Sequence, residues 1–154
     1  ATKIEKMVRE LDEKTGYRVY ISAKKSLGGE SITDYSNRLA GELGEHYVLL
    51  AIATEDQQIE MRMSEDADRV IDKDEILDEF IIPILVERRK DIEPLQQYSA
   101  AIFNGVAETV DQLAASKNIV LANSVGSGSK NFYDGLMFVV KILLLLVEIR
   151  VAMT

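Results

Sequence analysis

The sequence contains no cysteine and no tryptophan, and it has one histidine and two prolines in 154 residues. Without cysteine, the chain cannot form a disulfide scaffold, a thiolate zinc site or a cysteine nucleophile. The single histidine, His46, leaves little room for imidazole-based metal binding or a serine–histidine–aspartate triad. We interpret His46, which directly precedes an apolar run, as a partly buried structural residue.

Charge and apolar residues are distributed unevenly along the chain. Asp and Glu number 26 against 18 Lys and Arg, which gives a net charge of −8. Such an acidic chain argues against nucleic acid as a partner, because binding to phosphate backbones needs a basic surface. Residues 132–154 carry no net charge, and 17 of these 23 positions are hydrophobic. The sequence therefore predicts an acidic domain over residues 1–120, a flexible Gly/Ser-containing linker over 121–131 and a hydrophobic C-terminal helix over 132–154.

The spacing of apolar residues predicts strands that alternate with helices. Ser31 and Asp34 have the spacing of a capping box at the start of a helix. Residues 47–53 form a continuous apolar run, typical of a central strand covered on both faces, and 58–63 alternate as expected of its hairpin partner. Pro83 predicts a kink or break in its helix. In chain order we expect helix 3–15, strand 17–23, helix 31–43, strands 47–53 and 58–63, an acidic connector 64–74, helix 76–89, and a helix from 91–94 to about 117. This order predicts an α/β fold with helices on the faces of a sheet.

Taken together, these segments resemble the TPM domain family, which is named after a thylakoid lumen phosphatase-like protein, a photosystem II repair protein and a nematode receptor-modulating protein. The resemblance covers roughly residues 5–115 and rests on the order of several short motifs. The residues that carry it are Leu11, Thr15, Gly16 and 19–21 at the start, Gly29, Ser31, Ile32, Tyr35 and Leu39 around the second helix, 48–52, Glu55, Asp56 and 60–62 in the hairpin, and 81–83, Gly105 and Val106 in the last two helices.

The resemblance implies a three-layer α/β/α sandwich outside the cytoplasm, often tethered by a hydrophobic C-terminal segment. Members of the family mostly maintain, assemble or modulate membrane complexes, while some bind calcium and some are weak acid phosphatases. The sequence departs from the family pattern in two regions that contribute to an acidic pocket. Residues 63–66 stand in place of a glycine-rich stretch, and the chain starts at Ala1 without a short acidic segment. This start fits a processed, exported protein whose leader has been removed, and it fits a trimmed sequence equally.

An acidic run over residues 65–79 is the candidate metal site. A hard cation such as Ca²⁺ prefers six to eight oxygen ligands. Asp74 and Asp78 are four residues apart and share a face of a helix, and Asp66 and Asp68 can point together from a loop. These four aspartates are therefore the predicted calcium ligands. The alternative is a solvated acidic surface in which one aspartate caps a helix, and the run lacks EF-hand spacing.

The hydrophobic segment 132–154 is the most informative local feature. Within it, residues 135–153 include 15 apolar and three charged positions, and about 20 mostly apolar residues span a bilayer. Asp134, Lys141 and Glu148 are seven residues apart and lie on one stripe of a helix. Charged groups at membrane depth usually face protein, so we predict a transmembrane helix that packs on partner helices. The alternatives are a core or coiled-coil helix of a soluble domain and a helix lying in the membrane plane.

Three functions fit these features. The first is a non-catalytic accessory or assembly subunit of an integral membrane protein complex, with its domain on the periplasmic, lumenal or extracellular side. The second is a membrane-anchored, metal-dependent acid phosphatase, and the third is a calcium-binding module without catalysis. The residues themselves assign no catalytic group, so enzymatic activity rests on the resemblance alone.

Overall fold

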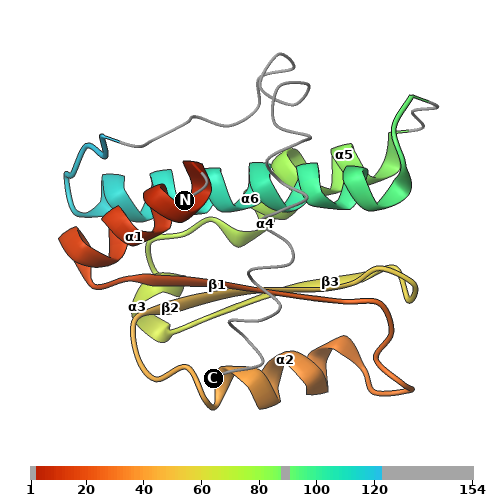
Figure 1. Ribbon diagram of the computed structural model, residues 1–154. Coiled ribbons are helices and arrows are strands. Elements are labelled where there is room, and N and C mark those ends of the chain that lie inside the picture. Colours follow the sequence, from red (N-terminus) through yellow and green to blue (C-terminus); the bar gives the residue numbers. More distant parts are fainter. Residues whose placement is uncertain (1–2, 88–90, 123–154) are drawn as a thin grey trace.

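The computed structural model describes residues 3–87 and 91–122, which form a three-stranded sheet with helices on both faces (Figure 1). The strands are β1 (Arg18–Lys24), β2 (Tyr47–Ala53) and β3 (Gln58–Met63), with β2 in the middle. β1 and β2 pair in parallel, whereas β2 and β3 form an antiparallel hairpin. A parallel pair needs a crossover, and helix α2 (Ile32–Ala40) supplies it. The predicted α/β class is confirmed.

The helices divide into two layers. One face of the sheet carries α1 (Lys3–Thr15), α6 (Pro94–Ser116) and, beside α6, a short arm, while the other face carries α2 (Figure 1). The arm consists of α4 (Lys73–Glu75), the π-helix η1 (Ile76–Ile81) and α5 (Ile82–Val86), and the four-residue helix α3 (Glu65–Asp68) follows β3. The main hydrophobic core lies between the sheet and the layer that contains α1 and α6.

Strand β2 is buried on both sides, as the apolar run predicts. Val48, Leu50 and Ile52 belong to the main core under α1 and α6. Ala51 and Ala53 point the other way and belong to a smaller cluster under α2. The alternation of side chains along a strand explains this division, and every residue of β2 after Tyr47 is buried.

The face of the sheet under α2 is more polar. The buried hydroxyl of Ser36 on α2 accepts a hydrogen bond from Arg62 Nε at 2.9 Å, and Arg62 also pairs with Glu60 on the same strand at 3.5 Å. The hydroxyl oxygens of Ser22 and Tyr35 lie 2.5 Å apart. Because buried polar groups are costly without partners, these bonds fix the orientation of α2 on the sheet.

Three predicted boundaries are wrong. β1 begins at Arg18 and ends at Lys24, one residue later than predicted at each end. α2 ends at Ala40 and not at residue 43, because Gly41 follows and the chain then turns through Gly44, whose φ of 75° lies in the left-handed region. The predicted acidic connector contains two short helices, α3 and α4.

The helix predicted over 76–89 is a π-helix followed by a short α-helix. Pro83 has no N–H to donate to a carbonyl four residues earlier, and Ile82 donates its N–H to Leu77, five residues earlier. The predicted break is therefore confirmed as a widened turn before Pro83. On α6, the side chain of Gln97 donates hydrogen bonds to the carbonyls of Ile84, Leu85 and Glu87, which hold the end of α5 against α6.

Helix α6 begins with a capping box between Glu93 and Gln96, and its start at Pro94 confirms the prediction. After α6 the backbone N–H of Ala122 donates to Glu10 on α1 at 2.8 Å. The chain therefore leaves the described domain beside α1. The predicted helix 132–154, with Asp134, Lys141 and Glu148, and all of the predicted linker except Leu121 and Ala122, lie outside the described residues.

Candidate functional site

The four predicted calcium ligands lie at different places in the fold. Asp66 and Asp68 are on α3, Asp74 is on α4 and Asp78 is on η1. Asp68 and Asp74 line one open pocket, whereas Asp66 pairs with His46. Asp78 does not line this pocket.

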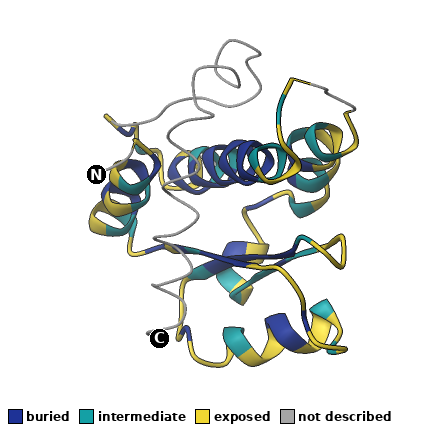
Figure 2. Ribbon diagram, turned by 45° about the vertical axis from the view of Figure 1, so that its right-hand side comes forward, coloured by how far each residue is buried: buried dark blue, intermediate teal, exposed yellow. Residues whose placement is uncertain are grey.

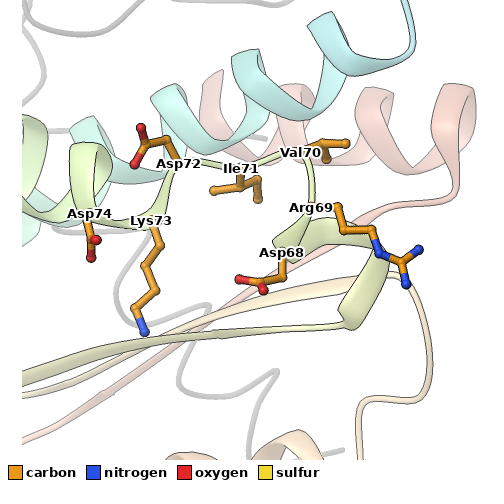
Figure 3. A pocket seen from close by; sticks show the side chains of 7 residues that line it. All are labelled: Asp68, Arg69, Val70, Ile71, Asp72, Lys73 and Asp74. Carbon is orange, nitrogen blue, oxygen red and sulfur yellow. The ribbon is translucent and has the colours of Figure 1, made fainter.

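The open pocket has a volume of about 570 Å³ and is formed by the chain between α3 and α4 (Figure 3). Ile71, one of its lining residues, is buried in the main core. The N–H of Asp72 donates to Gln112 on α6 at 2.8 Å, and the Asp72 carboxylate accepts from the N–H of Glu75. Asp72 therefore caps α4, as the alternative interpretation of the acidic run predicts.

The charges around this pocket are mixed. Its lining residues are Asp68, Arg69, Val70, Ile71, Asp72, Lys73 and Asp74. In Figure 3 the carboxylates of Asp68 and Asp74 and the extended side chain of Lys73 lie on the side away from Asp72. Over residues 3–87 and 91–122, no three His, Asp or Glu side chains are grouped so that they could hold a metal ion. Calcium binding by the four aspartates stays a prediction.

A second polar cluster lies at the amino ends of β1 and β2. The Nδ1 atom of His46 lies 2.5 Å from Oδ2 of Asp66. The ring of Tyr17 meets the His46 ring edge-on at 6.2 Å, and the Lys117 ammonium lies 5.7 Å from the Tyr17 ring centre. His46 itself has a φ of 56°, which is uncommon for a residue other than glycine. Its side chain is 56% exposed, so the interpretation of His46 as a partly buried residue is wrong.

The electrostatics of this cluster centre on Asp66. Partial burial acts to raise the pKa of its carboxyl, but hydrogen bonds from Ser64 and His46, the charge of His46 and a backbone hydrogen bond from Ala67 outweigh that effect and lower the pKa to about 2. Burial and the neighbouring Asp66 carboxylate, which also accepts a hydrogen bond from the phenol, raise the pKa of Tyr17. Asp66 is therefore ionised at neutral pH and orients the His46 ring.

We expect Asp66→Asn to lower the free energy of unfolding by up to about 1 kcal/mol at pH 6. The folded-state pKa of about 2 lies below the ordinary value of 3.8, so ionised Asp66 stabilises the fold above pH 4. This contribution is lost as the pH falls from 4 to 2, and the wild type and the variant should then converge. The side chain is 36% exposed, and solvent screening keeps the effect small. Urea unfolding at pH 6, 4 and 2.5 measures it.

Asp68→Asn is the matched control, because Asp68 is an exposed residue on the same short helix. It should change the unfolding free energy at pH 6 by less than Asp66→Asn does. Equal losses for both variants, or a loss for Asp66→Asn that is the same at pH 6 and 2.5, would contradict the role given to the His46–Asp66 pair.

The sequence matches the model of the TPM domain family over residues 1–115, about three quarters of the chain. This chain belongs to the TPM domain family. The NMR structure of the BA42 protein from the psychrophilic bacterium Bizionia argentinensis is similar to it, with 17% identity and a TM-score of 0.51 over 81% of this chain and 90% of that one. At this identity the likeness concerns the fold alone. No curated protein sequence matches this chain.

In this TPM domain the pairing of His46 with Asp66 is the feature that the sequence interpretation missed. The hairpin register offers a signal for it. Val48 pairs with Met63, so the residues just before β2 and just after β3 must lie near one another. A histidine directly before one strand and an aspartate three residues after its partner are therefore candidates for contact.

The helices of the described TPM domain give no sign of a membrane crossing. Over residues 3–87 and 91–122, no helix is both long and apolar enough to span a bilayer. The predicted transmembrane helix begins at residue 132 and is not tested by this finding.

Proposed function

We propose that this TPM protein is a non-catalytic accessory or assembly subunit of an integral membrane protein complex. In this proposal the domain lies on the periplasmic, lumenal or extracellular side of the membrane, and residues 132–154 form a helix that packs on helices of the partner. Membership of the TPM family supports the proposal, because the resemblance implies upkeep or assembly of membrane complexes.

The observation that carries the proposal is the composition of the chain beyond the family domain. Residues 132–154 hold 17 hydrophobic positions out of 23, with Asp134, Lys141 and Glu148 each seven residues apart. A helix that only anchors a domain in lipid rarely has a lysine near its middle. A charged side chain at that depth raises the free energy of insertion unless protein or water surrounds it. A stripe of three charges suits a helix that contacts other helices.

The position at which the chain leaves the domain is compatible with a short tether. Ala122 is fixed to Glu10 on α1, and nine residues separate it from residue 132. Nine extended residues reach at most about 30 Å. A domain held this close to a membrane can act on the part of a complex that stands just outside the bilayer.

Purification of the full chain from native membranes in mild detergent tests the proposal. We expect the wild type to elute together with subunits of one membrane complex and Lys141→Leu to lose at least 80% of them. Lys141→Arg keeps the charge and should retain them, and Lys25→Leu removes an exposed positive charge from the domain and should have no effect. A protein that elutes alone in every variant would refute the proposal.

A further inference from the structure

Helix α1 carries a row of cations on its surface. Lys3, Lys6 and Arg9 are all exposed, and their spacing of three residues places them within about 120° of one another around the helix. The residues that α1 buries in the main core lie on another side of it. Figure 2 shows both kinds on this helix, yellow for exposed residues and dark blue for buried ones. We call Lys3, Lys6 and Arg9 the α1 row.

The cations of the α1 row have no electrostatic partner in the described domain. Within residues 3–87 and 91–122, most Lys and Arg side chains form an ion pair or lie over an aromatic ring. Lys3, Lys6 and Arg9 do neither, and in these ranges only Lys25 and Lys73 share this condition. Most of the unpaired cations in the described part of a chain with a net charge of −8 are therefore gathered on one helix.

The acidic residues of α1 cancel the row only in part. Glu10 is buried and pairs with Lys14 at 2.7 Å, and Asp12 pairs with Arg18 at 3.5 Å. Glu13 is exposed on the same side of the helix as the row and offsets one of its three charges. A net positive surface remains on α1, in a domain that is acidic as a whole.

Helix stability does not account for the α1 row. The amino end of a helix carries a partial positive charge, so acidic residues are favourable in the first turn and cations are not. The first turn of α1 has Glu5, as expected, but it also has Lys3 and Lys6. These two lysines weaken the helix slightly, so a contact outside the domain is the better explanation for them.

The α1 row lies beside the point at which the chain leaves the described domain. Glu10 comes four residues after Lys6 and so lies on the same flank of α1. Its carboxylate accepts the N–H of Ala122 at 2.8 Å. The hydrophobic segment begins at residue 132, and the nine residues between reach at most about 30 Å. The row is therefore held close to any surface that holds the hydrophobic segment.

We propose that the α1 row binds the anionic lipid headgroups of the membrane that holds residues 132–154. The inference rests on the proposed function in taking these residues as a membrane helix, and it adds the lipid surface and the side of the domain that faces it. Anionic lipids give a membrane a negative surface potential, and each Lys or Arg near that surface strengthens binding by about fivefold. The same potential repels the acidic remainder of the domain, so the domain turns α1 towards the membrane.

Tryptophan reporters test the inference, because the natural chain has no tryptophan. Glu13→Trp places one on the exposed side of α1, and Asn37→Trp places one on α2, on the opposite face of the sheet (Figure 1). Each full chain is reconstituted into vesicles that contain a lipid with a nitroxide on its headgroup, which quenches tryptophan at the membrane surface. With about 30% phosphatidylglycerol present, we expect Glu13→Trp to be quenched about three times more strongly than Asn37→Trp. This ratio should fall by at least about half when phosphatidylcholine is the only lipid, or in about 0.5 M salt.

Charge reversal separates the α1 row from other cations of the domain. In the Glu13→Trp chain, Lys6→Glu should lower the quenching in anionic vesicles by at least about half, and Arg9→Glu should do the same. Lys6→Arg keeps the charge and should keep the quenching. Lys25→Glu is the matched control, because Lys25 is an exposed, unpaired cation that follows the far end of β1, and it should have almost no effect.

Equal quenching of the two reporters in anionic vesicles, or equal effects of Lys6→Glu and Lys25→Glu, would overturn the inference. A row that instead binds an acidic protein would leave Glu13→Trp unquenched in vesicles without that protein, which overturns it as well. Flotation of the vesicles distinguishes this failure from that of the proposed function. A chain that floats but shows no difference between the reporters has a membrane helix without the α1 contact, whereas a chain that floats with neither kind of vesicle has neither.

Discussion

Gly105→Ala is expected to lower the free energy of unfolding by about 2 kcal/mol, although alanine is the better helix former. Gly105 lies in the middle of α6 against η1. A Cβ atom at this position would lie 2.5 Å from Cγ1 of Ile81 and closer still to its Cδ1. Ile81 is fully buried and its neighbour Ile76 is too, so the side chain has little room to move. The gain in helix propensity, about 1 kcal/mol, offsets only part of this overpacking.

Urea unfolding of Gly41→Ala, Ile81→Ala and the double variant Ile81→Ala/Gly105→Ala separates the clash with Ile81 from other effects of the added methyl group. Gly41→Ala is the matched control, because the nearest atoms to its Cβ would be carbonyl oxygens at 3.5 and 3.8 Å. It should leave stability unchanged or raise it slightly. In an Ile81→Ala background, Gly105→Ala should cost much less than in the wild type. A full 2 kcal/mol loss in that background would show that the contact with Ile81 is not the cause.

Ile52→Ala is expected to lower the free energy of unfolding by about 3 to 4 kcal/mol. Ile52 is fully buried in the main core and sits on the central strand, where it pairs with Ala23 on one side and Ile59 on the other. Truncation removes three carbon atoms and leaves a cavity that paired strands on both sides cannot close. Total stability of a domain of this size is about 5 to 15 kcal/mol, so the variant should lose a large share of it.

Val120→Ala provides the comparison for Ile52→Ala, because Val120 is 89% exposed. Its effect should stay within about 0.5 kcal/mol. Both variants should unfold with the denaturant slope of the wild type, since neither changes the surface exposed on unfolding much. If Ile52→Ala costs less than 1 kcal/mol at an unchanged slope, the central strand does not anchor the core in the way described above.

The strands β2 and β3 could be predicted to the residue because their sequence signals are local. A continuous apolar run from Tyr47 to Ala53, a polar turn and an alternating partner determine both strands and their pairing. The end of α2 could not be predicted as well. Leu43 continues the apolar stripe and is buried, but the chain reaches that position through a turn after Gly41. Periodicity alone does not distinguish a helix from a turn that buries the same residue.

The candidate site was predicted less well than the fold. The spacing of Asp74 and Asp78 predicted a shared helical face, but Asp74 lies on α4 and Asp78 on η1, and Asp74 lines the open pocket whereas Asp78 does not. The pair that does form, His46 with Asp66, joins two residues 20 positions apart. Such a contact depends on the register of the hairpin, and a search for ligands within one acidic run does not reveal it.

The contact of α1 with α6 has a consequence for how the protein is made. Ile4, Met7 and Leu11 on the first helix belong to the same core as Val106, Val110 and Leu113, about 100 residues later in the chain. During synthesis at about 5 to 20 residues per second, the first helix waits roughly 5 to 20 s before its partner leaves the ribosome. Over that interval its apolar face is available to chaperones or to an export machinery, and the domain can close only after nearly all of its residues have been synthesised.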